Sequence, residues 1–239
     1  MRGVEPENPF GPEHESPPGS EVLATGDGSA SETFPGYELW SADELAALQD
    51  GNPFRMRARV VARMRLVFEG LRHRMARHVA AGHYLGPAAC DWQGGKIGRG
   101  EYLGDMPYVY LDLPRYFDAE SAFTFRTLFW WGHGISFSLI LGGPHLAEYR
   151  QRLLRHADVL SALDVHVAIG ETPWDWERGA GHTLKVEAGR EPELARLLRA
   201  QSYLKCVRFL DFDDLDFRRC RIDDAALLTF QALEPLILA

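Results

Sequence analysis

The sequence predicts an α+β fold: a mostly antiparallel sheet of about five to six strands with helices packed against it. Two observations lead to this prediction. Helical periodicity fills the start of the folded part and returns between later strands. Two of the connections between strands are too short for the crossover helix that parallel strands require. A long, basic, amphipathic helix near the N-terminus completes the expected architecture.

The first 36 residues differ in composition from the rest of the chain. They contain six prolines, six glycines, seven acids and one base, so they hold −6 of the total net charge of −8. Such a segment buries too little apolar surface to offset its ordering entropy. We therefore expect a disordered acidic tail over residues 1–36 and a single α+β domain over residues 37–239.

Two helices are expected to open the folded part. Ser41 to Glu44 has the form of a capping box, which predicts a short helix. From Pro53 to about Ala81 apolar residues recur at steps of three and four, which predicts a long helix with one apolar face. The apolar positions are Met56, Val60, Met64, Val67, Phe68, Leu71, Met75 and Val79.

The long helix carries the clearest charge pattern. Residues 53–79 hold eight arginines and one acid, for a net charge of +7. The arginines away from the apolar face are candidate partner-binding residues: Arg55, Arg59, Arg63, Arg74 and Arg77. They could pair internally with the acidic run at residues 211–216, lie under the acidic tail, or bind an anionic partner or acidic protein surface. Nucleic acid is a less favoured partner because the chain as a whole is acidic.

Residues 84–106 read as a glycine-rich connection, and its segment 94–104 invites a phosphate-loop interpretation. The spacing fits no Walker or dinucleotide-binding motif, since Lys96 is followed by Ile97 and not by Ser or Thr. Closely spaced glycines still let backbone amides approach an anion, and Lys96 and Arg99 add positive charge. The segment is therefore either a ligand-contacting loop or a flexible connection.

A strand at residues 108–113 precedes an apolar hairpin with His133 near its tip. A three-residue loop that pairs Trp131 with Ile135 and Phe129 with Phe137 gathers the apolar side chains on one face. His133 is then either a turn residue or a catalytic group. The opposite face carries Arg126 and Trp130, with Asp112 and Tyr110 beside them if the preceding strand is the neighbour. That face is either an ordinary second face with one structural ion pair or the floor of a pocket.

The remaining elements alternate in the same manner. A helix follows Gly143, short strands cover residues 164–169 and 182–187, a helix starts near Pro192, a strand covers 203–212 and a terminal helix starts near Ile222. Between the two short strands, Thr172 to Asp175 resembles a capping box. We interpret Trp174 and Trp176 as anchors of this turn on the core, with stacking on a ligand as the alternative.

Several function classes are not supported by any motif. No histidine–carboxylate spacing predicts a metal site, no cofactor motif occurs, and no nucleophile elbow marks an acyl-transfer serine. The three cysteines, Cys90, Cys206 and Cys220, have no paired spacing, which favours reduced thiols in the cytoplasm. No run of residues is apolar enough to span a membrane.

The leading hypothesis is therefore a cytoplasmic binding or interaction protein that uses the arginine-rich helix and the acidic tail. The alternative is an enzyme acting on a small anionic, phosphate- or carboxylate-bearing substrate. In that alternative Lys96, Arg99 and Arg126 hold the anion, Tyr110 and Trp130 form the walls, and Asp112 or His133 transfers the proton. The sequence predicts neither the oligomeric state nor the partner.

Overall fold

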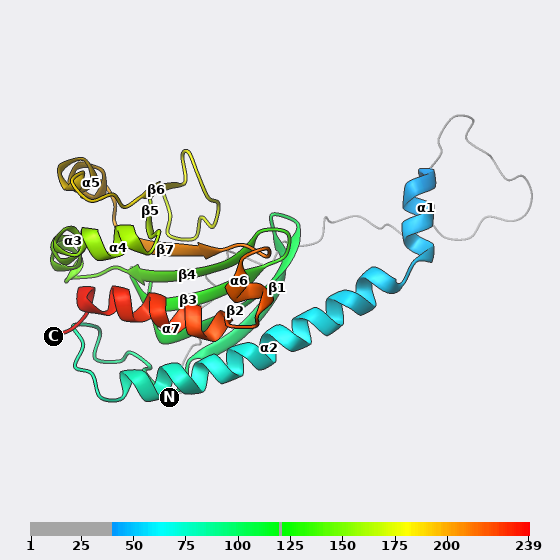
Figure 1. The fold of residues 1–239 in the computed structure, drawn as a ribbon, viewed down its shortest axis with the longest axis horizontal. Helices are drawn as coiled ribbons and strands as arrows, with labels where there is room; N and C mark the ends of the chain where they lie inside the picture. The colour runs from blue at the N-terminus through cyan, green and yellow to red at the C-terminus, as the bar shows by residue number, and fades with distance from the viewer. Residues whose placement is uncertain (1–39, 120) are drawn as a thin grey trace, which may run out of the picture. The chain divides into compact units, whose positions relative to one another are not determined.

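The computed structural model describes residues 40–119 and 121–239, which form helices and one antiparallel sheet (Figure 1). The helices are α1 (Ala42–Gln49), α2 (Asn52–Val79), α3 (Leu146–Arg155), α4 (Ala157–Ala162), α5 (Glu191–Arg199), α6 (Leu215–Arg218), α7 (Ile222–Leu233) and the short 3-10 helix η1 (Glu234–Leu236). The strands are β1 (Lys96–Leu103), β2 (Met106–Phe117), β3 (Ala122–Trp130), β4 (Gly134–Leu141), β5 (His166–Ala168), β6 (Thr183–Lys185) and β7 (Leu204–Leu210).

The chain divides into two compact units, Met1–Val60 and Val61–Ala239. Of the first unit, only residues 40–60 are described, and they comprise α1 and the first turns of α2. The predicted tail, residues 1–36, lies outside the described residues. The expected helix over residues 53–81 is α2, and the predicted domain boundary at residue 37 stays a prediction.

The sheet has the strand order β1-β2-β3-β4-β7-β5-β6, and every neighbouring pair is antiparallel. The α+β fold predicted from the sequence is thus confirmed. The described residues form seven strands, one more than the upper estimate, because residues 96–103 form the edge strand β1. The sequence prediction had placed these residues in an irregular glycine-rich connection.

The glycines of β1 have a steric role. A Cβ atom on Gly98 would lie 2.3 Å from Cζ of Tyr110, and one on Gly100 would lie 2.3 Å from Cζ of Tyr108. The two tyrosine rings therefore lie across the glycines of the neighbouring strand, and both are only 8% exposed. Cross-strand aromatic cover of this kind compensates for the missing side chains of edge glycines. The glycines serve the packing of β1 on β2.

The predicted register of the β3–β4 hairpin is wrong by two residues. Phe129 pairs with Ile135 and Trp130 pairs with Gly134, so the three-residue loop is residues 131–133. Both Gly132, with φ 81°, and Gly134, with φ 112°, take up conformations that favour glycine, and they close the turn one residue earlier than expected. Because side chains alternate between the two faces of a sheet, a register error of two residues still assigns each side chain to the correct face.

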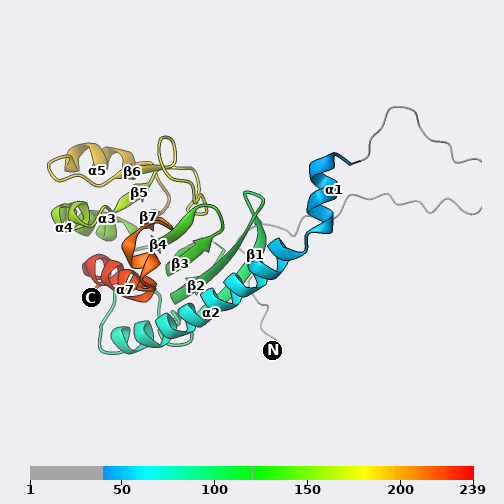
Figure 2. The same ribbon diagram turned by 45° about the vertical axis from the view of Figure 1, so that its right-hand side comes forward.

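One face of the sheet, here called the helical face, carries Phe123, Phe125 and their neighbours and packs against helices. Phe125 contacts Phe230 of α7 edge to face, with ring centroids 5.2 Å apart, and Phe123 contacts Tyr149 of α3. Figures 1 and 2 show α7 lying over the middle strands of the sheet. Buried aromatic and aliphatic side chains from both layers form the core.

Helix α2 contributes the side chains Val61, Met64, Phe68, Leu71, Met75 and Val79 to the buried interior. Its C-terminal half is held to α7, because Arg74 forms ion pairs with Asp223 and Asp224, and His78 contacts Phe230. Nearly all of the buried positions of α2 were expected from the periodicity. Met56, Val60 and Val67, which the same pattern included, are not buried, and the buried Val61 was not part of the predicted pattern.

Two glycine-to-alanine substitutions should change stability in opposite directions. Gly98→Ala places a Cβ against the buried ring of Tyr110, so we expect the free energy of unfolding to fall by about 1–3 kcal/mol. Gly70 lies on the exposed side of α2, and a Cβ added there would have nothing within 4 Å. Gly70→Ala should therefore raise the free energy of unfolding by about 0.5–1 kcal/mol. Urea unfolding measures both. A Gly98→Ala protein as stable as the parent would contradict the packing role of this glycine.

Candidate functional site

The opposite face of the sheet, here called the polar face, carries Asp112, Arg126, Ser136, Ser138 and Lys205. Asp112, Arg126 and Ser138 stand side by side on neighbouring strands. Arg126 donates from Nε to Asp112 Oδ1 at 2.6 Å and from Nη2 to Oδ2 at 2.7 Å. The side chains are only 1% and 2% exposed. The sequence-based expectation that Asp112 lies near Arg126 is confirmed, and the geometry is a buried bidentate ion pair.

Aromatic rings enclose the Arg126 guanidinium. Its Cζ lies 4.4 Å from the ring centre of Tyr110, 5.3 Å from that of Trp174 and 5.5 Å from that of Trp176. Both tryptophans belong to the segment between β5 and β6, which therefore covers the polar face. Cation–π attraction and the ion pair together hold this segment on the sheet. The expectation that these tryptophans anchor a turn agrees with this packing.

Lys205 of β7 lies under the same cover. Its ammonium group is 3.6 Å from the ring centre of Trp176 and donates to the backbone oxygens of Pro173 and Asp175 at 3.0 and 2.5 Å. The residue is 1% exposed. Burial lowers the pKa of Lys205 to about 7. The negative charge of nearby Asp175 raises this pKa, whereas the positive charge of Arg126 lowers it.

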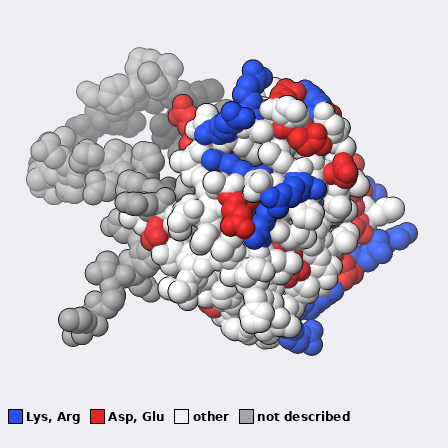
Figure 3. All heavy atoms as spheres, turned by 90° about the vertical axis from the view of Figure 1, so that its left-hand side faces the viewer, with Lys and Arg blue, Asp and Glu red and all other residues white. Residues whose placement is uncertain are grey.

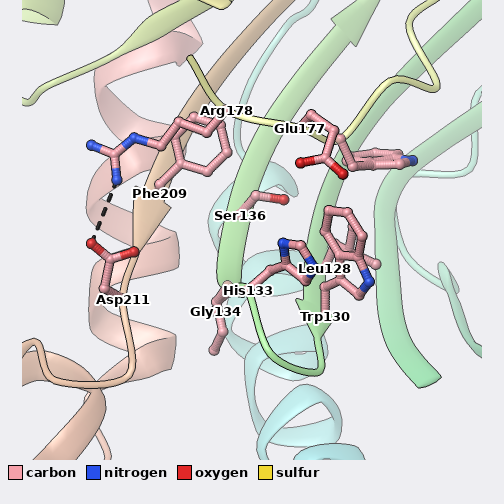
Figure 4. A pocket seen from close by; sticks show the side chains of 11 residues that line it. Leu128, Trp130, His133, Gly134, Ser136, Glu177, Arg178, Phe209 and Asp211 are labelled. Carbon is pink, nitrogen blue, oxygen red and sulfur yellow. Dashed lines mark hydrogen bonds and ion pairs between the residues drawn. The ribbon is translucent and has the colours of Figure 1, made fainter. Parts of the chain in front are cut away.

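Beside this covered region, the polar face opens into a pocket of about 200 Å³ (Figure 4). Its floor is a row of cross-strand neighbours, Leu128, Ser136 and Phe209. The other lining residues come from the β3–β4 turn, the β5–β6 segment and the end of β7: Trp130, His133, Gly134, Ile135, Trp176, Glu177, Arg178 and Asp211. Three distant parts of the chain thus meet around one hollow.

His133 lies flat on Trp130 at this pocket. The two ring centroids are 3.5 Å apart and the planes differ by 8°. Trp130 is itself fixed, because its Nε1 donates to the backbone oxygen of Leu103 at 2.7 Å. His133 is therefore more than a solvated turn residue, since its ring completes a wall of the pocket.

Two buried polar groups of the pocket have no hydrogen-bond partner among the residues described. They are the hydroxyl of Ser136, a residue 6% exposed, and the indole Nε1 of Trp176, a residue 5% exposed. Figure 4 shows Ser136 in the middle of the hollow, facing Glu177. No hydrogen bond links Ser136, His133 and Glu177 within the described part of the chain, so these side chains do not form a catalytic triad in this structure.

Charges at the mouth of the pocket are only partly neutralised. Arg178 lies over the ring of Phe209, 5.1 Å from its centre, and approaches Asp211 at 3.5 Å and Asp164 at 3.6 Å. Asp164 is also paired with Lys185 at 2.6 Å. Glu177 is exposed, and its carboxylate makes no ion pair within residues 40–119 and 121–239.

The residues predicted to hold a small anion do not converge. Lys96 pairs with Asp112 and shares its face, whereas Arg99 pairs with Val109 and lies on the opposite face of β1. Arg126 is already neutralised by Asp112 and covered by aromatic rings. Tyr110 and Trp130 do line the polar face, as expected. Of the two candidate proton-transfer groups, His133 reaches the pocket and Asp112 is committed to the ion pair.

The five candidate arginines of α2 fall into two groups. Arg74 is bound internally by Asp223 and Asp224, and the sequence had pointed to the acidic run at residues 211–216 for such pairing. Arg55, Arg59, Arg63 and Arg77 are exposed. Arg55 donates to Asn52 Oδ1 at 2.9 Å, while the side chains of the other three have no ion-pair partner among the described residues.

Sequence reasoning missed Lys205, Glu177 and Arg178. A lysine in a strand is normally exposed, so nothing in the sequence indicated that Lys205 is buried. Glu177 and Arg178 follow Trp176 directly, and their charge beside a buried tryptophan was the one signal available. Within the described residues, no group of three histidine, cysteine, aspartate or glutamate side chains is placed to hold a metal ion. The helices described also include none with the length and apolar character needed to cross a membrane.

The buried amine of Lys205 gives a testable pH dependence. Between about pH 7 and the ordinary lysine value of 10.5, the unfolded chain binds a proton that the folded chain has lost. The contribution of Lys205 to the free energy of unfolding therefore rises with pH across that window, by up to about 1.4 kcal/mol per pH unit. Lys205→Met should remove this rise. Unfolding free energies of both proteins at several pH values measure the difference, and parallel curves would contradict the lowered pKa.

Comparisons with protein families, curated proteins and solved structures found no match for this chain. The functional argument accordingly starts from the chain's own geometry.

Proposed function

We propose that the protein is a binding protein that docks an acidic protein surface on the exposed arginines at the start of α2. The observation that carries this proposal is the pairing of exposed arginines with exposed apolar side chains in residues 40–60. Arg55 and Arg59 are exposed, and between them Met56 is 51% exposed. Phe54, directly before Arg55, is 68% exposed.

The residue types favour a protein partner. Arginine, methionine and aromatic residues are the side chains enriched in protein–protein interfaces. A surface that binds a nucleic acid backbone needs positive charge but gains little from exposed Phe54 and Met56. The overall acidity of the chain also disfavours a polyanion without apolar groups.

Helix α1 supports the same proposal. It has eight residues and none of them is buried, and Leu45 and Leu48 are 46% and 66% exposed. Its capping box satisfies the first turn, since Ser41 and Glu44 exchange hydrogen bonds. A helix this short is marginal in water without tertiary packing. Burial of its leucines against a partner would stabilise it.

The contrast with another charged part of the molecule strengthens the choice of α2. Figure 3 shows the end of the molecule formed by α3 and α5, where basic and acidic side chains are interspersed. There Arg190 pairs with Glu187 and Glu193, and Arg152 pairs with Glu148. An arginine that is already engaged in such an exposed ion pair contributes little energy to the binding of a further partner. Among residues 40–119 and 121–239, no carboxylate forms such a pair with the exposed arginines of α2.

The acidic tail enters the proposal as a competitor. Residues 1–36 carry a net charge of −6 and end 19 residues before Arg55 and 23 residues before Arg59. Held so close in sequence, the tail has a high effective concentration at the arginines. It would therefore screen them from weak partners and yield to a partner with apolar groups as well as charge.

Replacing both arginines tests the surface. We expect Arg55→Gln/Arg59→Gln to weaken binding of an acidic peptide, such as a glutamate-rich peptide containing leucines, by about tenfold, because two charge-assisted contacts are lost. The matched control is Arg196→Gln/Arg199→Gln on α5, which changes the net charge equally at exposed positions. Fluorescence anisotropy of the labelled peptide measures both. Equal losses in the two double variants would contradict a localised surface, and tighter binding of duplex DNA than of the peptide would make nucleic acid the partner.

Deleting residues 1–36 tests the competition. We expect the truncated chain to bind the same peptide more tightly, and the gain to shrink as salt is added, because charge attraction between tail and helix is screened. The measurement is the dissociation constant of both chains across a salt series. Identical constants at every salt concentration would rule out the role of the tail and leave the arginine surface to the test above.

A further inference from the structure

We infer that the pocket on the polar face is a binding site for a small organic cation, an amine or quaternary ammonium group. This inference is independent of the arginine surface on α2. It rests on the lining of the pocket, on the charge left within it and on contacts that the chain already makes between cations and aromatic rings.

The walls of the pocket suit a cation. Trp130, Trp176 and Phe209 line it, and aromatic faces attract ammonium and guanidinium groups. With a volume of about 200 Å³, the pocket accepts a group the size of a side chain or a choline-like head. Trp130 is locked by its hydrogen bond to Leu103, so this wall is preorganised.

The charge in the pocket has the sign that a cation needs. Arg178 is shared between Asp211 and Asp164, and Asp164 is further paired with Lys185. After these pairings the Glu177 carboxylate is left over, and Figure 4 shows it directed into the hollow opposite Ser136. A small anion would meet Glu177 and Asp211 there, so the charge of this pocket disfavours an anionic ligand.

The same face already binds cations of the chain itself by this chemistry. Arg126 lies among Tyr110, Trp174 and Trp176, and Lys205 lies 3.6 Å from the ring centre of Trp176. Arg178 lies over Phe209 at the mouth of the pocket. The pocket continues this row with aromatic walls and the Glu177 carboxylate, and the one arginine that lines it, Arg178, is held by Asp211 and Asp164.

Two unpartnered buried groups point to what else the ligand carries. The Ser136 hydroxyl can accept a hydrogen bond from an ammonium N–H or donate one, and the Trp176 Nε1–H can only donate. A cation that also bears a hydroxyl or carbonyl oxygen, as an amino alcohol does, would offer a partner to the Ser136 hydroxyl on the floor of the pocket. Choline and ethanolamine are therefore suitable probes, and tetramethylammonium tests the cation alone.

The test titrates the full-length chain with choline, ethanolamine and tetramethylammonium chlorides, each against potassium chloride at equal ionic strength. We expect a saturable change in tryptophan fluorescence and a rise in Tm, with affinities in the weak range of about 10 mM or tighter that ligands of this size allow. Acetate and glucose are run in parallel. Absence of a saturable response to all three cations, or a response to glucose or acetate in their place, would overturn the assignment.

A charge-removing variant locates the site. Glu177 is exposed and unpaired in the described structure, so Glu177→Gln should fold normally and weaken cation binding by about tenfold. Glu171→Gln, an exposed carboxylate of the same segment that does not line the pocket, is the matched control and should leave the affinity unchanged. Binding that is equally strong in both variants would place the cation elsewhere and refute the proposal.

Discussion

The ion pair between Asp112 and Arg126 is the interaction on which the polar face of this protein depends. A charged pair with almost no exposed surface is stable only when its geometry is nearly ideal and its surroundings compensate for lost water. Here both conditions hold, since two short hydrogen bonds join the groups and three aromatic rings enclose the guanidinium. The segment between β5 and β6 has no long regular structure of its own, and its tryptophans rest on this pair.

The packing of this segment on the ion pair determines which part of the polar face is covered and which part stays open. Trp176 serves both parts: its ring lies over Lys205, and it also lines the adjoining pocket. Any movement of the segment would therefore expose the Lys205 amine and change the pocket together. The helical face is independent of this arrangement, because Phe125, Phe230 and their neighbours form a dry core against α3 and α7.

The sequence was sufficient for the fold class and for the proximity of Asp112 to Arg126, because alternation along a strand assigns side chains to faces. It did not determine the hairpin register, since a shift of two residues leaves the same faces buried and Gly132 and Gly134 offered two positions for the turn. Strand β1 was not predicted because its glycines interrupt the alternation of apolar and polar side chains. The tyrosine rings of β2 pack over these glycines, and this packing is not visible in the local sequence. The pocket joins residues from three distant segments, which no local pattern can reveal.

A double-mutant cycle on Asp112 and Arg126 tests the central claim most directly. The free energy of unfolding would be measured by urea denaturation for Asp112→Leu, Arg126→Met and the double variant. Each single variant leaves one buried charge unpaired and should lose about 3–5 kcal/mol, while the double variant should lose much less than the sum. Losses that simply add would show that the two residues act independently, and the ion pair would then not be what holds the polar face together.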